Sequence, residues 1–335
     1  MLPAAALALI LLAAPRLNGV AVTPFSENPS AGVTFLGMID EIAATGATDV
    51  SIVVQWSQAN VASNQILPHP KETQDEGVIR AMMGRARAKG LHVLLFPILW
   101  VEQRSPGVWR GTLRPENPGL WWASYRQFIL HFADLAASER ADLFSVGSEL
   151  GTMEPDAAHW RALIAEVRTH FQGRLVYSAN WDHFEAVPFW DAVDVVGLTA
   201  YHRLTEVQPP AQPAEEDLRA AWSRIRTVLL DWRQNHVPGR PFIFTEVGYP
   251  SMDGAAYRPW EYNIGGTVDL EEQRRCYTAF ADVWQDEPAL SGVYFWNWWG
   301  QGGAGDANYT PRGKPALPVM RRFFEHRQQG AAHRP

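Results

Sequence analysis

Residues 49–56 read DVSIVVQW, and residues 91–99 read LHVLLFPIL. Both are short, almost continuous apolar runs, which is typical of strands that are buried on both faces of a parallel sheet. Between them, residues 73–76 (TQDE) form a capping box, and the helical pattern that they open ends at Gly90. A buried strand, a helix and a second buried strand in this order predict a β-α-β unit with parallel strands.

The same alternation continues along most of the chain. Six further strand-like runs, separated by helical patterns, lie at residues 19–23, 142–147, 174–179, 193–199, 241–245 and 291–298. Eight β-α repeats in about 300 residues predict a single-domain α/β protein, a (β/α)8 TIM barrel. The alternative is a doubly wound open sheet. It is disfavoured because no Gly-x-Gly-x-x-Gly follows the first strand and because eight strands suit closure.

The composition argues against several classes of protein. Charged residues are 19% of the chain and hydrophobic residues 47%, which is not the balance of a disordered protein. The net charge of −7 argues against a nucleic-acid partner, because binding to phosphates depends on Lys and Arg. With Cys276 as the one cysteine and no His-Glu-x-x-His pattern among the histidines, we expect no metal and no cofactor.

The two ends of the chain differ in character from its centre. The apolar run from Leu2 to Ala14 is too short to form a stable membrane span but has the length of a signal-peptide hydrophobic region. We interpret residues 1–16 as a signal peptide or an apolar N-terminal arm, residues 17–325 as the barrel domain and residues 326–335 as a polar tail. A signal peptide predicts a secreted or periplasmic protein, although no Lys or Arg precedes the apolar run.

Acidic residues follow two of the predicted strands. Chemistry in a TIM barrel takes place where the strands end, and Glu149 and Glu246 lie at the ends of the fourth and seventh strands. A carboxylate at the end of a buried strand needs a partner or a function, and a structural ion pair would explain either one alone. Two of them, among Trp, Tyr and Asn residues, favour a functional role.

Aromatic and polar side chains accompany the two glutamates. The candidate substrate-binding residues are Trp56, Trp100, Ser148, Asn180, Trp181, Asp182, Tyr201, His202, Trp296 and Trp298. The tryptophans could instead belong to the core or the rim. Glycoside hydrolysis needs this set, because one carboxylic acid protonates the leaving oxygen while a second carboxylate attacks or directs water. The sequence therefore predicts a glycosidase with an oligo- or polysaccharide substrate.

Several motifs resemble a known group of enzymes. They are VGSEL (146–150), YSANW (177–181), VDVVGLTAY (193–201), FTEVGYPS (244–251) and GVYFWNWW (292–299), with VWRGTLRP (108–115) and WWASYRQF (121–128) upstream. Their order is similar to that of clan A glycoside hydrolases, and they look most like family 113, whose known members are β-mannanases. The resemblance covers essentially the whole barrel.

The resemblance implies a retaining mechanism and assigns roles to individual residues. Glu149 matches the family's acid/base, and Glu246 matches its nucleophile. Tyr201 matches an aromatic residue near the nucleophile, and Trp296 or Trp298 matches the aromatic residue under the cleaved sugar. We accordingly expect a protonated Glu149 and an ionised Glu246 in the resting enzyme.

One position departs from the pattern of the wider clan. Most members have an Asn before the acid/base, where it bonds the sugar 2-hydroxyl, and this chain has Ser148. That contact is then absent, water-mediated or supplied by Asn180. The sequence therefore predicts the type of reaction better than the identity of the sugar. Two other interpretations remain: a catalytically silent carbohydrate-binding barrel, and an aldolase or isomerase for phosphorylated sugars, a class that often needs a Schiff-base Lys or a metal.

Overall fold

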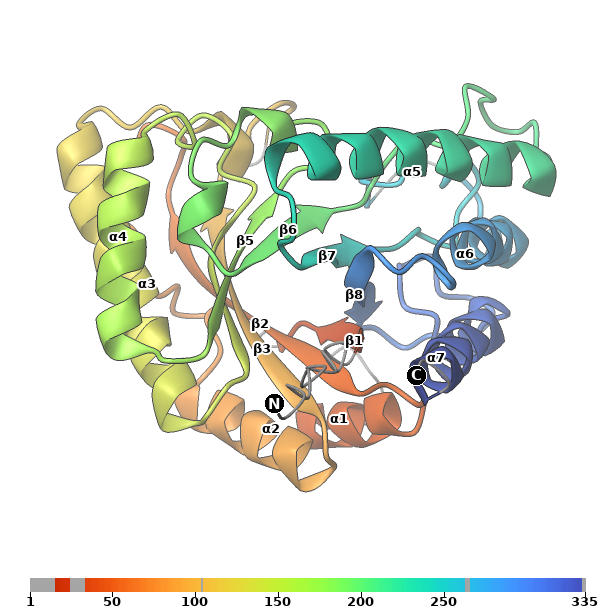
Figure 1. Ribbon diagram of the computed structural model, residues 1–335, viewed down its shortest axis with the longest axis horizontal. Helices are drawn as coiled ribbons and strands as arrows, with labels where there is room; N and C mark the ends of the chain where they lie inside the picture. Colours follow the sequence, from red (N-terminus) through yellow and green to blue (C-terminus); the bar gives the residue numbers. More distant parts are fainter. Residues whose placement is uncertain (1–15, 25–33, 104, 263–265, 333–335) are drawn as a thin grey trace, which may run out of the picture.

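The computed structural model describes residues 16–24, 34–103, 105–262 and 266–332. Its eight strands are parallel and pair in sequence order, and β8 pairs with β1 to close the barrel. Helices surround the strands as an outer ring (Figure 1). The strands are β1 (Leu17–Val22), β2 (Asp49–Gln58), β3 (His92–Val101), β4 (Leu143–Ser148), β5 (Arg174–Ala179), β6 (Val195–Thr199), β7 (Phe242–Val247) and β8 (Leu290–Trp298). The predicted single-domain TIM barrel is confirmed.

Most helices of the ring begin at a polar side chain. The helices are α1 (Phe35–Ala43), α2 (Glu76–Ala88), α3 (Pro118–Ser138), α4 (Ala157–His170), α5 (Glu215–His236), α6 (Leu270–Trp284) and α7 (Ala316–Ala332). The capping side chains that accept a backbone N–H are Thr34, Asp75, Asn117, Asp156 and Asp269. The predicted capping box at residues 73–76 is wrong, because Asp75 caps α2 and the Thr73 hydroxyl donates to the backbone of Gln55.

The crossover from β5 to β6 differs from the expected pattern of strands separated by helices. Residues 180–194 contain only two short 3-10 turns, η2 (Phe184–Ala186) and η3 (Trp190–Ala192). Phe184 and Trp190 are buried, and their rings contact Trp232 of α5 with centroid distances of 4.8 and 6.1 Å. These two aromatic side chains cover the barrel where a helix would otherwise pack.

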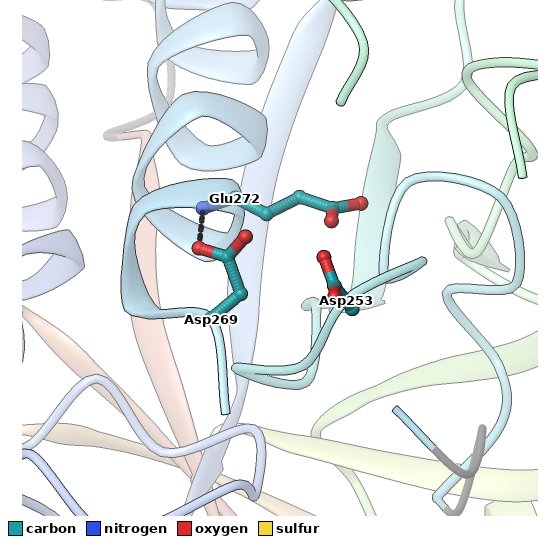
Figure 2. Close-up of side chains that lie close together, drawn as sticks. All are labelled: Asp253, Asp269 and Glu272. Atoms are coloured by element: carbon teal, nitrogen blue, oxygen red, sulfur yellow. Dashed lines mark hydrogen bonds between the residues drawn. The ribbon is translucent and has the colours of Figure 1, made fainter. Parts of the chain in front are cut away.

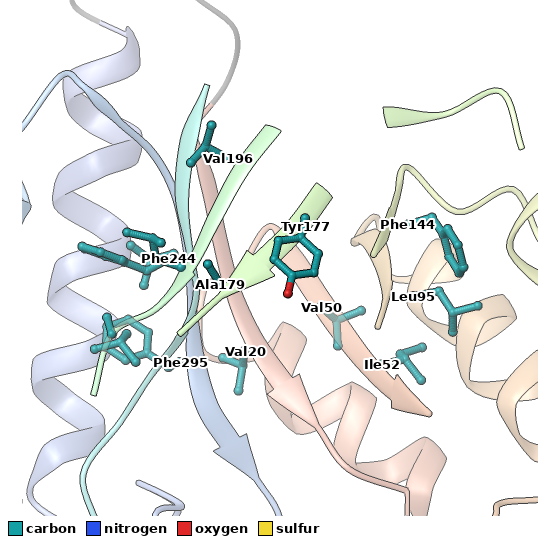
Figure 3. Packing of buried hydrophobic residues seen from close by; sticks show 14 of the residues in the cluster. Val20, Val50, Ile52, Leu95, Phe144, Tyr177, Ala179, Val196, Phe244 and Phe295 are labelled. Atoms are coloured by element: carbon teal, nitrogen blue, oxygen red, sulfur yellow. The ribbon is translucent and has the colours of Figure 1, made fainter. Parts of the chain in front are cut away.

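Strand alternation divides the core into two parts. One part fills the inside of the barrel, with side chains from successive strands that include Leu17, Ala21, Val53, Leu94, Phe96, Leu143, Val176, Val195, Ile243 and Tyr294. The other lies between the strands and the helices (Figure 3). At Gly19, an added Cβ would lie 2.3 Å from the ring of Tyr294, so β1 needs glycine where that ring crosses the interior. Side chains of the described strands therefore fill the barrel centre.

The C-terminal helix extends further than the sequence indicated. We expected a polar tail from residue 326, but α7 continues to Ala332 and Arg327 is fully buried. Its guanidinium donates to the Asn18 side chain and to the carbonyl of Leu290, both at 3.0 Å. The proposed signal or arm at residues 1–16 lies outside the described residues except for Arg16. Among the helices described, none has the length and hydropathy to cross a membrane.

Candidate active site

Glu149 and Glu246 lie at the same end of the barrel. Glu149 follows β4, Glu246 is near the end of β7, and both are buried, with 6% and 3% of their surfaces exposed. Thr199 connects them: it is the register partner of Glu246 at the end of β6, and its hydroxyl donates to Glu149 Oε1 at 2.6 Å. The two carboxyl groups predicted from strands four and seven therefore meet at the barrel mouth.

Arg110 also binds Glu149 and was not among the predicted site residues. It belongs to η1 (Arg110–Thr112), in the loop after β3, and its Nη2 lies 2.6 Å from Glu149 Oε2. The side chains of Arg110 and Glu149 are 18% and 8% exposed, so this ion pair is largely shielded from water. The sequence marked Arg110 only as part of a family-like stretch, which gives no role to one residue.

The protonation of Glu246 reflects its surroundings. Burial raises the pKa of Glu246 to about 8, and the nearby charge of Glu149 raises it as well, while Arg110 and the hydroxyl of Tyr201 lower it. Tyr201 donates to Glu246 Oε2 at 2.7 Å, and Oε1 has no hydrogen-bond partner among the described residues. The raised pKa favours a proton on Glu246, whereas we expected Glu246 to be ionised in the resting enzyme.

Aromatic rings form a wall beside the two glutamates. Trp181 stacks on Trp260 at 5.5 Å, and Trp296 donates its indole N–H to the hydroxyl of Tyr262 at 2.9 Å. Tyr309 contacts both Tyr262 and Tyr201, at 4.9 and 6.1 Å between ring centroids. Trp260, Tyr262 and Tyr309 come from loops, where no periodic pattern marked them in the sequence.

Two predicted sugar-binding tryptophans face the helices instead of the mouth. Trp56 packs against Phe128 of α3 with 5.6 Å between ring centroids. Trp298 donates its indole N–H to Glu41 of α1 at 2.8 Å. Trp56 shares the outward face of β2 with other core residues, and Trp298 belongs to the same outer core, so we correct both assignments. Trp100 is half-buried, and its spacing from Leu94, Phe96 and Ile98 of the inner core assigns it to the inward face of β3.

The polar candidates remain at the barrel mouth. The Ser148 hydroxyl is buried and has no hydrogen-bond partner among the described residues. Asn180 donates to Asp182 at 2.8 Å and lies 3.2 Å from the Thr199 hydroxyl, so it belongs to the network around Glu149. The His202 ring is packed edge-on against two Trp rings, and burial lowers its pKa to about 3, so it is neutral.

Two hollows lie next to loops at this end of the barrel. One, of about 560 Å³, is bordered by Trp181, His202, η2 and α5. The other, of about 760 Å³, lies between the loops after β2 and β3 and the start of α3. Neither is lined by Glu149 or Glu246, but each begins at residues that directly follow strands at the mouth.

A group of three acids lies apart from this site, between the loop after β7 and α6 (Figure 2). In Asp253, Asp269 and Glu272, one oxygen from each carboxylate lies within 4.8 Å of the others. Glu272 accepts two backbone N–H groups of the loop, Asp269 caps α6, and Asp253 accepts from Gln212. These bonds explain the cluster as a brace for the loop, without a metal.

A comparison with protein families identifies the family to which the chain belongs. Residues 35–312 match the sequence profile of Glycoside Hydrolase Family 113. The chain belongs to glycoside hydrolase family 113. Family membership makes the protein a glycoside hydrolase, and its substrate a carbohydrate, in agreement with the acids and aromatic rings at the barrel mouth.

Solved structures of family 113 share the fold. The GH113 β-mannanase AaManA from Alicyclobacillus acidocaldarius, in complex with ManMIm, is 29% identical, with 93% of this chain and 97% of that chain covered and a TM-score of 0.80. A second GH113 β-1,4-mannanase is 21% identical, with 93% and 99% coverage and a TM-score of 0.76. A β-glucuronidase from Faecalibacterium prausnitzii shares only the fold, at 14% identity over 49% of its length (93% of this chain) and a TM-score of 0.62. No curated protein sequence matches the chain.

Proposed function

We propose that this family 113 enzyme hydrolyses a β-1,4-mannan-type polysaccharide with retention of configuration. Glu149 is the acid/base and Glu246 the nucleophile. The observation that carries this proposal is the meeting of two buried glutamates, from the ends of β4 and β7, around Thr199 at an aromatic-lined mouth. The 29% identical neighbour is a β-mannanase, which supports mannan as the substrate class.

The proposed reaction has two displacements. In the first, the unpartnered Oε1 of Glu246 attacks the anomeric carbon, the glycosidic C–O bond breaks, and Glu149 gives its proton to the leaving oxygen. In the second, Glu149 takes a proton from a water molecule, whose oxygen attacks the anomeric carbon and releases Glu246. The hydroxyl of Tyr201 holds Glu246 through both steps.

This reaction needs a proton on Glu149, whose two carboxyl oxygens accept hydrogen bonds from Arg110 and Thr199. We infer that the leaving-group sugar displaces the Arg110 guanidinium from Glu149 when substrate binds. Glu149 can then give a proton to the leaving oxygen, while the positive charge of Arg110 still lowers the pKa of Glu246. Binding of the substrate would thus prepare both carboxyl groups for the first step.

A reducing-sugar assay tests the proposal. The parent, E149Q and E246Q are incubated with mannan, glucomannan, xylan, glucan and galactan, with E116Q on an exposed surface as the matched control. Mannan cleavage by the parent and E116Q, and its loss in the other two variants, is the expected result. Proton NMR of the first product then distinguishes retention from inversion.

Two outcomes would contradict the proposal. Full activity of E246Q would remove the nucleophile assignment. Binding of mannan by the parent without release of reducing ends would favour the catalytically silent barrel. Azide adds an independent check, because E149A should yield a β-glycosyl azide and E246A an α-glycosyl azide if the two roles are assigned correctly.

A polymeric substrate also supports the location proposed from the N-terminal sequence. A mannan chain is too large to be taken up intact, so the enzyme would meet it outside the cytoplasm. We therefore propose that the protein is secreted or periplasmic. Processing of the apolar run is tested by N-terminal sequencing of the protein recovered from its natural host.

A further inference from the structure

Glu149 has a backbone conformation that needs support. Its φ of +55° lies in the left-handed region, which residues other than Gly, Asn and Asp seldom adopt. Two hydrogen bonds fix the backbone here: Glu149 N–H donates to the Ser178 carbonyl at 2.8 Å, and Leu150 N–H donates to the Tyr177 hydroxyl at 3.2 Å. The second of these bonds comes from a side chain on β5 and can be removed by substitution.

Tyr177 is itself held by a buried acid that the proposed mechanism does not use. The Tyr177 hydroxyl donates to Glu154 Oε1 at 2.6 Å, and Glu154 is fully buried. Glu154 lies in the turn that follows Glu149, where its backbone N–H donates to the Leu150 carbonyl at 3.1 Å. Glu154, Tyr177 and Leu150 thus form a closed set of hydrogen bonds around the turn that carries Glu149.

These groups lie behind the site and not within it. Tyr177 belongs to the core between the strands and the helices, and its ring packs edge-on against Trp160 of α4 at 5.1 Å and Phe189 at 5.0 Å. Burial raises the pKa of the Tyr177 hydroxyl well above its usual value, so it stays protonated and remains a donor. A substrate at the mouth would contact Glu149 and would not reach Glu154.

We propose that Glu154 and Tyr177 are positioning residues for the acid/base: they hold the left-handed turn that aims the Glu149 carboxyl at the leaving-group oxygen. This inference rests on the proposed function of Glu149. It adds to that function a pair of residues whose loss should impair proton donation specifically, and leave the nucleophile, Glu246, able to react.

The electrostatics around Glu154 agree with a neutral hydrogen-bonding role. Burial raises the pKa of Glu154 to about 7, with Glu149 and Asp182 raising it further, and Tyr177 and His183 lowering it. Its Oε2 has no hydrogen-bond partner among the described residues, and the nearest ring nitrogen, His183 Nε2, is 3.9 Å away. A protonated Glu154 and a glutamine present the same acceptor to Tyr177, so E154Q is a conservative variant.

The test compares two substrates that differ in their need for an acid. The dinitrophenolate group of an activated dinitrophenyl β-mannoside leaves without protonation. The leaving sugar of a manno-oligosaccharide must be protonated. For Y177F and E154L we expect kcat/KM on the oligosaccharide to fall by about 10-fold to 100-fold, and kcat/KM on the activated glycoside to change less than about 3-fold. E154Q should stay near the parent on both substrates, because it keeps the acceptor.

Y125F is the matched control. Tyr125 is also a fully buried tyrosine in the helix layer, and its hydroxyl donates at 2.9 Å to the carbonyl of Val146 in β4, so it contacts the strand before Glu149 and not the turn itself. The Y125F variant should be less stable than the parent, but the ratio of its kcat/KM values on the two substrates should not change. Thermal melts of all variants separate a loss of folding from a loss of positioning.

E149A distinguishes a failure of this inference from a failure of the proposed function. Suppose that E149A loses more kcat/KM on the oligosaccharide than on the activated glycoside. The positioning role is then overturned if Y177F and E154L lower kcat/KM equally on both substrates, or on neither. It is also overturned if E154Q behaves as E154L does, since the acceptor alone would then be insufficient. If E149A itself lowers both rates equally, Glu149 is not the acid/base, and the proposed function falls together with the inference.

Discussion

Arg110 and Tyr201 act on opposite members of the carboxyl pair. Arg110 donates to Glu149 and Tyr201 donates to Glu246, and the positive charge of Arg110 also reaches Glu246, where it lowers the pKa that burial raises. The charge of Glu149 raises the pKa of Glu246, so the two acids do not ionise together without cost. At the residue scale, burial and the charge of Glu149 raise the pKa of Glu246, and one arginine on a loop opposes them.

Replacing Arg110 by methionine should move the pH profile of the reaction. Without the guanidinium charge, the pKa of Glu246 rises, so a smaller fraction of this proposed nucleophile is ionised at a given pH. The acidic limb of kcat/KM, which reports this ionisation in the free enzyme, should move to higher pH by about one unit. R114M, on an exposed arginine of the same loop, should leave the limb in place. An unmoved limb in R110M would show that Arg110 does not control the pair.

At the scale of single elements, the faces of the strands could be predicted where pairing is regular. In β2, Val50, Ile52 and Val54 alternate with inward residues, and the same alternation places Trp56 outward. In β4 and β7 the register shifts after Ser145 and Phe244, just before the catalytic candidates. A residue beyond such a shift changes face in a way that depends on the neighbouring strand, which is why Glu149 could be placed at the mouth but its turn could not.

The acidic cluster in Figure 2 should brace the loop after β7 without a metal. Glu272 uses both carboxylate oxygens to accept backbone N–H groups, and an amide offers only one acceptor. E272Q should therefore leave one buried N–H unpaired and lower the free energy of unfolding by about 1–3 kcal/mol in urea denaturation. E271Q, at a neighbouring exposed position, should change it little. A parent enzyme that loses stability in EDTA would instead reveal a bound cation.

For the whole molecule, the count of buried runs predicted the closed barrel, since eight strands in parallel order leave β1 and β8 to pair. At the C-terminus, the composition led to a wrong prediction of a polar tail. Residues 326–335 read as polar, yet Arg327 is buried because Asn18, Trp284 and Leu290 supply acceptors from β1, the end of α6 and β8. These partners are distant in the sequence, and nothing local to α7 indicates them.

This contact should contribute to global stability without affecting catalysis. Arg327 joins α7 to both strands that close the barrel, so R327M leaves the Asn18 side chain and two backbone carbonyls without their donor in a buried place. The free energy of unfolding should fall by about 2–4 kcal/mol in urea denaturation, because hydrogen bonds to a charged group are lost together. R322M replaces an exposed arginine on the same helix. Its free energy of unfolding should lie within about 0.5 kcal/mol of that of the parent. At a temperature where both variants are folded, their kcat/KM should equal that of the parent. A loss of activity in R327M alone would mean that the contact of α7 with β1 and β8 affects the active site.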